Sequence, residues 1–279
     1  MLWGWMVRMQ VEGAQQAMPV LGIVQAKAVV DEVEMNLATL ECLVGDAAAA
    51  GAEIVVTPEL FATGYAPDRA WRHDGDRVRR ALASMASRHA VALVASSVHA
   101  VADGHRIAAS FFDEQGKEIA RVHKRHLFGP VEKAWMRPGE GCSGLVSWRG
   151  VTWGMAVCYD VEFPELVREL AMAGAEALLV PTAVPAIEEG VKGAGDAWHY
   201  SGAQISRLQV PARALDNGLV IAYANHCGAG FTGHSVVATP FGGIAAMLGD
   251  EQGIAVVRVP DGAIARARSI NTYLEDLAR

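Results

Sequence analysis

The sequence predicts an α/β protein in which helices cover the outer faces of mixed sheets. Short apolar runs alternate with segments of helical periodicity, two alternating runs flank a turn sequence, and no Pro/Ser-rich linker divides the 279 residues. Residues 18–279 are therefore expected to form a single domain.

The first half of the chain has a β-α-β-α-β order. Apolar runs predict the strands, and apolar side chains recurring three and four positions apart predict the first helix. The expected elements are a strand at 20–26, a helix at 33–51, a strand at 54–56, a helix at 74–89 and a strand at 91–98.

The second half continues with a hairpin and further β-α-β units. Two alternating runs between residues 107 and 122 flank Asp113-Glu114-Gln115-Gly116, a turn composition, so part of the sheet is antiparallel. Pro164 is expected to open a helix, because proline fits the first helical position. The other expected elements are strands at 151–157, 177–180, 219–225 and 253–259, a helix at 201–216, and hairpin strands within 234–248.

Composition excludes several classes of partner. The formal net charge is −7 with scattered Lys and Arg, which leaves no basic face for nucleic acid. Four widely separated cysteines predict neither a disulfide framework nor a CxxC site and suit a reducing cytoplasm. No apolar run approaches the roughly 20 residues of a membrane span.

Residues 1–17 do not resemble a signal peptide and are interpreted as a loose tail or a misannotated start, with Met18 as the natural initiator.

Three residues with reactive side chains lie at or just after the ends of predicted strands, where α/β proteins often place functional groups. They are Glu59, Lys124 and Cys158. Each taken alone has an ordinary interpretation: a surface carboxylate, a solvated loop charge and an inert buried thiol. The combination and its order along the chain carry more information than any one residue.

This Glu-Lys-Cys order resembles the nitrilase, or carbon–nitrogen hydrolase, superfamily. The likeness extends over nearly the whole chain, and Glu132, seven positions before Gly139, matches the second glutamate of that family. Further matching segments are Phe61-Ala62-Thr63-Gly64-Tyr65, His126-Leu127-Phe128-Gly129, Arg137-Pro138-Gly139-Glu140, Pro181-Thr182-Ala183, 212–218 and 222–228.

The resemblance implies a four-layer α-β-β-α sandwich and a homodimer or higher homo-oligomer that pairs through helices, with the region after Pro164 and the C-terminal tail at the interface.

The resemblance also implies catalytic roles. Amide cleavage by a thiol needs a base and an oxyanion stabiliser. Glu59 fits the base, while Lys124 and the backbone N–H of Tyr159 fit the oxyanion site. Glu132 is expected to hold the substrate amide or to orient Lys124 and Glu59. No metal or other cofactor is needed.

The segment after the cysteine bears on the substrate, a small-molecule amide. Cys158-Tyr159-Asp160 is similar to the amidases of the superfamily rather than to the Cys-Trp-Glu of true nitrilases. Members that bind a substrate carboxylate carry an Arg at the third or fourth position after the cysteine, where this chain has Val161 and Glu162. An anion there favours a neutral or cationic substrate. Several segments particularly resemble bacterial 5-aminopentanamidases and stereoselective amino-amide amidases.

Two aromatic residues are further candidates for substrate binding. Tyr65 follows the first glutamate, and Trp198 lies in a stretch, 186–200, that is longer than the usual connection in that subgroup. Trp198 is expected either to line the entrance or to pack against the following helix.

Other functions remain open from the sequence. Within the superfamily the alternatives are an N-carbamoyl-amine hydrolase or a nitrilase. His123 and His126, with His226-Cys227, have spacings that suit zinc, whereas the serines lack a G-x-S-x-G elbow. Two alternatives involve no turnover. One is a binding protein on the same fold. The other is a thiol switch in which Cys158 is exposed and Cys142 or Cys227 is the resolving thiol.

Overall fold

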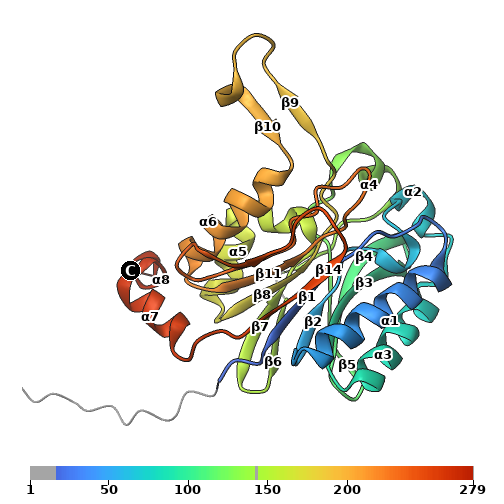
Figure 1. The fold of residues 1–279 in the computed structure, drawn as a ribbon, viewed down its shortest axis with the longest axis horizontal. Coiled ribbons are helices and arrows are strands. Elements are labelled where there is room, and N and C mark those ends of the chain that lie inside the picture. Colours follow the sequence, from blue (N-terminus) through green and yellow to red (C-terminus); the bar gives the residue numbers. More distant parts are fainter. Residues whose placement is uncertain (1–16, 142–143, 279) are drawn as a thin grey trace, which may run out of the picture.

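The computed structural model describes residues 17–141 and 144–278. Two six-stranded sheets pack face to face, and helices cover the outer face of each, α1 and α3 on one side and α5 and α6 on the other (Figure 1). The predicted four-layer α-β-β-α sandwich with mixed sheets is confirmed.

The first sheet has the strand order β14-β1-β2-β3-β4-β5. Strands β1, β2 and β3 are parallel, whereas β14, β4 and β5 each join an antiparallel neighbour. The carboxyl ends of β2, β3 and β5 therefore lie at one edge. Its strands are β1 (Leu21–Gln25), β2 (Ile54–Val56), β3 (Ala92–Val101), β4 (Gly104–Phe112), β5 (Glu118–His123) and β14 (Gly253–Val257).

The second sheet has the order β13-β12-β11-β8-β7-β6. Strands β7, β8 and β11 are parallel to one another, and an isolated parallel bridge between Ala26 and His226 aligns the end of β1 with the end of β11. The carboxyl ends of the central strands of both sheets thus meet at one edge. Its strands are β6 (Leu145–Trp148), β7 (Val151–Met155), β8 (Ala177–Pro181), β11 (Val220–Ala224), β12 (Val236–Ala238) and β13 (Ile244–Met247).

Three apolar layers hold the sandwich together. The middle layer joins the facing sheets, as in the packing of Ile23 and Phe111 from the first with Trp153 from the second. One outer layer lies under α1 (Val33–Ala49) and α3 (Gly75–His89), and the other lies under α5 (Pro164–Met172) and α6 (Val210–Asn217). Burial of this apolar surface is the main driving force for the assembly of the two sheets.

Short elements complete the chain and carry much of the site. They are η1 (Phe61–Thr63), α2 (Pro67–Ala70), α4 (Gly129–Trp135), η2 (Cys158–Glu162), η3 (Asp196–Trp198), the π-helical turn η4 (Ile205–Gln209), α7 (Ala263–Ile270) and α8 (Tyr273–Leu277).

The structure corrects one predicted helix. Residues 188–201 form a projecting hairpin of β9 (Glu188–Gly190) and β10 (His199–Ser201), so the helical segment expected from Ser201 starts only after Gly202 (Figure 1). Gly202 follows the hairpin with its backbone against the Pro185 carbonyl, where a Cβ atom would lie 2.6 Å from that oxygen. This close approach of the two ends of the hairpin delays the helix.

Three expectations lie beyond these observations. The tail interpretation of residues 1–17 falls almost wholly outside the described residues. The single domain and the pairing of two copies through α5 and the C-terminal region stay predictions. Within the described part of the chain, no helix combines the length and the apolar character needed to cross a bilayer.

Candidate active site

Glu59, Lys124 and Cys158 come together at the shared edge of the two sheets. Glu59 follows β2 and Lys124 follows β5, both from the first sheet, whereas Cys158 follows β7 of the second sheet. The Lys124 Nζ atom lies 2.9 Å from Glu59 Oε1, and both side chains are fully buried. The predicted cluster therefore forms across the interface between the sheets.

Glu132 joins the cluster from helix α4. Its Oε1 atom lies 2.6 Å from Lys124 Nζ and accepts a 2.5 Å hydrogen bond from the hydroxyl of Tyr65. Its Oε2 atom accepts a hydrogen bond from the backbone N–H of Phe128, the residue before α4. Lys124 is thus held between two carboxylates, an arrangement that compensates its buried charge.

The backbone of Glu59 is fixed by the second sheet. Its N–H donates to the carbonyl of Thr182 after β8, at 3.1 Å. Its carbonyl lies 2.6 Å from Nε2 of His226, which follows β11. The imidazole of His226 is buried and stacks between Phe61 and Phe231. Burial lowers the pKa of His226 to about 4, so the ring is neutral at pH 7 and donates its Nε2–H.

Cys158 is the first residue of the turn η2 and has a left-handed backbone, with φ at +49°. Such a conformation costs a non-glycine residue about 1–3 kcal/mol and is often found at functional sites. The thiol is buried and lies 3.8 Å from the carbonyl oxygen of Ala183. The strained turn places Sγ at the sheet edge rather than within a strand.

Burial and neighbouring charges set the ionisation of the cluster. Burial, helped by the Glu132 charge and opposed by Lys124, raises the pKa of Glu59 from 4.5 to about 7. Burial also raises the pKa of Cys158, and the Glu59 charge adds to this while Lys124 opposes it. Burial opposes the charge on Lys124, but Cys158, Glu59 and Glu132 outweigh it and raise its pKa. At neutral pH the group therefore holds a neutral thiol, a cationic lysine and a carboxylate close to its titration point.

The free oxygen of Glu59 completes this arrangement. Glu59 Oε2 is buried and has no hydrogen-bond partner among the described residues. A buried acceptor without a donor is rare in native structures and costs free energy. The thiol of Cys158 is close enough to this carboxylate to lower its pKa. The cluster is suited to transfer of the thiol proton to Glu59.

The candidates for substrate binding lie in three different places. Glu162 ends the turn η2, is half-buried, and has its pKa raised to about 7 by burial against the opposing charges of Lys124 and Arg213. Tyr65 is turned toward Glu132. Trp198 lies in the projecting hairpin with 66% of its surface exposed, and it lines a hollow formed by residues of that hairpin.

A cavity of about 340 Å³ opens beside Glu132. Its wall is mostly apolar and includes Tyr65, Phe128, Val131 and Pro185. A mostly apolar cavity with few polar groups is typical of small-molecule sites. Tyr159, the residue after the nucleophile candidate, packs edge-to-face on Phe128.

Two alternatives lose support. A thiol switch needs an exposed thiol of low pKa, whereas Cys158 is buried and its pKa is raised. Cys142 lies outside the described residues, and Cys227 is a free thiol. The histidines considered for zinc have different partners, since His123 stacks on His99 and His126 contacts Asp160. Among residues 17–141 and 144–278, no three potential ligands form a metal-binding group.

Two residues of the site were not assigned their roles from the sequence, in which His226 was considered only as a zinc ligand. Asp160 is buried and hydrogen-bonds to residues on both sides of the site. His226 fixes the Glu59 carbonyl. Both lie in segments that matched the superfamily, and an acidic residue two positions after the cysteine was the available signal for the first of them.

Comparison with known proteins decides the family. The sequence model described as Carbon-nitrogen hydrolase matches residues 20–269. The chain belongs to the carbon–nitrogen hydrolase family. It is therefore a hydrolase of carbon–nitrogen bonds, with amidases among its relatives.

Individual relatives agree with this family. A protein from Pseudomonas protegens named as a hydrolase in the pqqF 5′ region is 31% identical over 82% of this chain and 79% of its own. The 2-oxoglutaramate amidase of Bacillus subtilis is 27% identical over 82% and 86%. A cysteine-to-alanine variant of a nitrilase-superfamily amidase from Nesterenkonia AN1 superposes with a TM-score of 0.80 at 34% identity, covering 94% of each chain. Other structures of that amidase contain acrylamide or butyramide, or an acetamide moiety on its active-site cysteine.

Proposed function

We propose that this carbon–nitrogen hydrolase cleaves a small carboxamide to the carboxylic acid and ammonia through a thioester on Cys158. One observation carries the proposal: a buried lysine lies between Glu59 and Glu132, next to a neutral thiol, and Glu59 keeps one oxygen free. Nucleophile, base and cation are the three groups that attack on an amide requires.

Acylation begins when Glu59 takes the proton of the Cys158 thiol and the sulfur attacks the amide carbon. The carbonyl oxygen becomes an oxyanion beside the Lys124 ammonium and the N–H of Tyr159. A base with a pKa of about 7 is well matched to this transfer, because it accepts a proton near neutral pH and can return it. When the intermediate collapses, the C–N bond breaks and Glu59 protonates the departing nitrogen. Ammonia leaves and the thioester remains.

Deacylation uses the same groups in the same order. Glu59 removes a proton from water, the hydroxide attacks the thioester carbon, and Lys124 again faces the oxyanion. The C–S bond breaks, the carboxylic acid forms, and the proton on Glu59 returns to the sulfur. Glu132 accepts from both Lys124 and the Tyr65 hydroxyl, so it holds the cation in place and borders the cavity in which the amide would lie.

The relatives and the cavity support a small acyl group. The amidase from Nesterenkonia has been captured with acrylamide and butyramide, both short neutral amides. The cavity beside Glu132 holds about 340 Å³, and Phe128, Pro130 and Val131 give it an apolar wall. Such a wall favours a short aliphatic chain over one that is charged along its length.

Glu162 favours an ammonium over a carboxylate on the far end of the substrate. Its carboxylate is half-buried, and the charge of Lys124 opposes the rise of its pKa, which supports a position near the cluster. The guanidinium of the nearby Arg213 is already engaged within the protein. It donates to the backbone carbonyl of Glu162 and pairs with Asp216. A second anion beside Glu162 would be repelled, whereas an amino amide would compensate it.

The test measures ammonia released by the purified protein from butyramide, 5-aminopentanamide, a dicarboxylic acid monoamide, butyronitrile and an N-carbamoyl amine. Cys158→Ala is the inactive variant, and Cys42→Ala, which removes an exposed thiol of α1, is its matched control. Release from the first two amides that requires Cys158 and not Cys42 supports the proposal. Preference for the monoamide would refute only the role of Glu162.

The other substrates test a different reaction class. Cysteine-dependent carbon dioxide together with ammonia would identify an N-carbamoyl-amine hydrolase, and turnover of the nitrile alone would identify a nitrilase. Equal activity in Cys158→Ala and the unaltered protein would contradict the mechanism itself.

A further inference from the structure

Asp160 is a buried carboxylate that the proposed proton transfers do not use. It lies two residues after Cys158 in the turn η2, and only 2% of its surface is exposed. An isolated buried carboxylate is costly, so its hydrogen-bond partners reveal what the fold gains from it.

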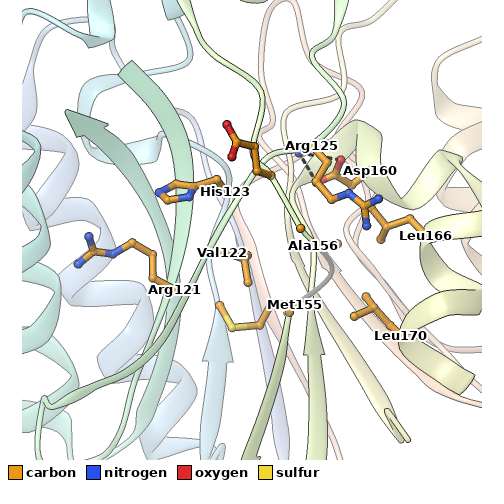
Figure 2. Close-up of a pocket in the computed structure, with 12 residues that line it drawn as sticks. Arg121, Val122, His123, Arg125, Met155, Ala156, Asp160, Leu166 and Leu170 are labelled. Atoms are coloured by element: carbon orange, nitrogen blue, oxygen red, sulfur yellow. Dashed lines mark hydrogen bonds between the residues drawn. The ribbon is translucent and has the colours of Figure 1, made fainter. Parts of the chain in front are cut away.

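The donors to Asp160 come from two loops that are far apart in the sequence. In the first loop, His126 donates its backbone N–H to Oδ1 at 2.8 Å, with the ring Nδ1 at 2.9 Å from the same oxygen. The backbone N–H of Arg125 lies 3.1 Å from Oδ1 (Figure 2). In the second loop, the backbone N–H of Val157 donates to Oδ2 at 3.2 Å. One carboxylate therefore joins the residues after Lys124 to the residue before Cys158.

These two loops leave different sheets. The first follows β5 of the first sheet and carries Lys124, and the second follows β7 of the second sheet and carries Cys158. Figure 2 shows Asp160 beside Arg125, with His123 on one side of the gap between the sheets and Leu166 of α5 on the other. A cavity of about 100 Å³ lies there, so side chains do not fill the space next to this junction. The hydrogen bonds of Asp160 connect the two loops across it.

We propose that Asp160 is a positioning residue that fixes the distance between Lys124 and Cys158 by clamping the two sheets at their shared edge. This inference rests on the proposed function, because Lys124 must stand beside the carbonyl that Cys158 attacks. A displacement of about 1 Å between such groups lowers a rate about 100-fold.

The chemistry of the contacts explains why a carboxylate is needed. An ionised carboxylate only accepts hydrogen bonds and offers about four lone-pair directions, which match donors arriving from two sides. An asparagine keeps the size but turns one oxygen into a donor, which would face the N–H of Val157 or of Arg125. Asp160 also closes the strained turn itself, since its own N–H donates to the Val157 carbonyl at 3.1 Å.

The first test compares Asp160→Asn with Asp113→Asn. Asp113 is a matched control because it too accepts backbone N–H groups, those of Gln115 and Lys117, but at the far end of the β4–β5 hairpin. With the amide that the unaltered enzyme cleaves best, kcat of folded Asp160→Asn should fall about 100-fold with KM within a few-fold. The control should lose thermal stability and keep kcat. Unaltered kcat per folded Asp160→Asn molecule would overturn the proposal.

The second test does not depend on amidase activity, so it separates this proposal from the proposed function. The rate of Cys158 alkylation by iodoacetamide is followed against pH by mass spectrometry. Lys124 lowers the pKa of the thiol, so its displacement in Asp160→Asn should move the profile to higher pH. Removal of a negative charge alone would move the profile to lower pH. A shift to lower pH, or none, would overturn the clamp.

A milder variant decides the matter if Asp160→Asn does not fold. His126→Phe removes one donor to Asp160 while the new ring can keep the stack on Phe163, where the rings now lie 3.6 Å apart. A several-fold fall in kcat with unaltered KM supports the clamp. An unaltered kcat overturns it.

Discussion

Replacement of Lys124 by methionine tests the charge balance of the cluster. The Nζ atom makes contacts of 2.9 Å and 2.6 Å with Glu59 and Glu132, and these three side chains are no more than 1% exposed. Removal of one partner of a buried ion pair costs about 3–5 kcal/mol, because a buried charge is left uncompensated. Here two carboxylates lose the same cation.

The size of this loss depends on pH. The pKa of Glu59 is about 7 with Lys124 present and rises further without it, because Lys124 is the main opposing charge. A carboxyl group whose pKa is raised on folding contributes its stability fully below its unfolded pKa of about 4.3, and loses it as pH rises through the folded value. Lys124→Met should therefore be destabilised less at pH 5, where Glu59 is protonated, than at pH 8, where the loss should be about 3–5 kcal/mol.

The assay is urea unfolding of both proteins at pH 5 and pH 8, with ammonia release measured in parallel. Lys133→Met on the exposed side of α4 makes the same chemical change at the surface and should lower stability by no more than about 0.5 kcal/mol at either pH. Loss of an oxyanion-stabilising group lowers kcat about 10²–10³-fold, and protonation of Glu59 lowers it further. A destabilisation independent of pH, or a kcat within tenfold of the original, would refute this reasoning.

Three further predictions concern other parts of the molecule. Since the pKa of Glu162 is about 7, the preference for amino over neutral amides should rise between pH 6 and 8, and kcat/KM ratios in Glu162→Gln should show no such rise. His226 has a folded pKa of about 4, below its ordinary 6.5, so its contribution to the free energy of unfolding is complete above pH 6.5 and falls by about 3 kcal/mol toward pH 4. In His226→Gln, the free energy of unfolding measured with urea should not show this decrease. A Cβ atom at Gly64, where φ is +71°, would lie 2.7 Å from Cα of Val30, whereas a Cβ atom at Gly51, where φ is +92°, would have open space. Gly64→Ala should therefore lower the melting temperature more than Gly51→Ala. Equal shifts in melting temperature would contradict the clash.

Much of the fold follows from local sequence pattern. Each strand of the first sheet coincides with an apolar or alternating run, and the turn at Asp113–Gly116 joins β4 to β5 as its composition predicts. The helix after Pro164 begins at that proline. These elements follow the period of burial, and burial is what the hydrophobic pattern records.

The projecting hairpin could not be predicted in this way. Strand β9 is exposed along its whole length and most of β10 is exposed too, so no alternation of apolar and polar residues distinguishes them from a loop. The hairpin is defined by backbone pairing between Glu188 and Ser201 and between their neighbours. The exposure of Trp198 follows from this projection, and an aromatic residue in a sequence ordinarily indicates burial.

The site was predictable only in part. Chain order and resemblance brought Glu59, Lys124, Cys158 and Glu132 together as candidates, and the structure places them in contact or close proximity. The interactions of Asp160 connect residues 34 and 35 positions away, and no local pattern records such contacts. Raised pKa values likewise depend on burial and on neighbours contributed by another sheet.

The division of the cluster between two sheets has a consequence for the nascent chain. Glu59 and Lys124 belong to the first sheet, and that sheet is completed beside β1 only when β14, near the end of the described chain, has been added. A partly synthesised protein can thus hold Cys158 apart from Lys124 and Glu59, the cation and base proposed to activate it. Its thiol then has the modest reactivity of any buried or unpaired cysteine. The cluster is complete only when the two sheets pack together, in the same fold that buries it.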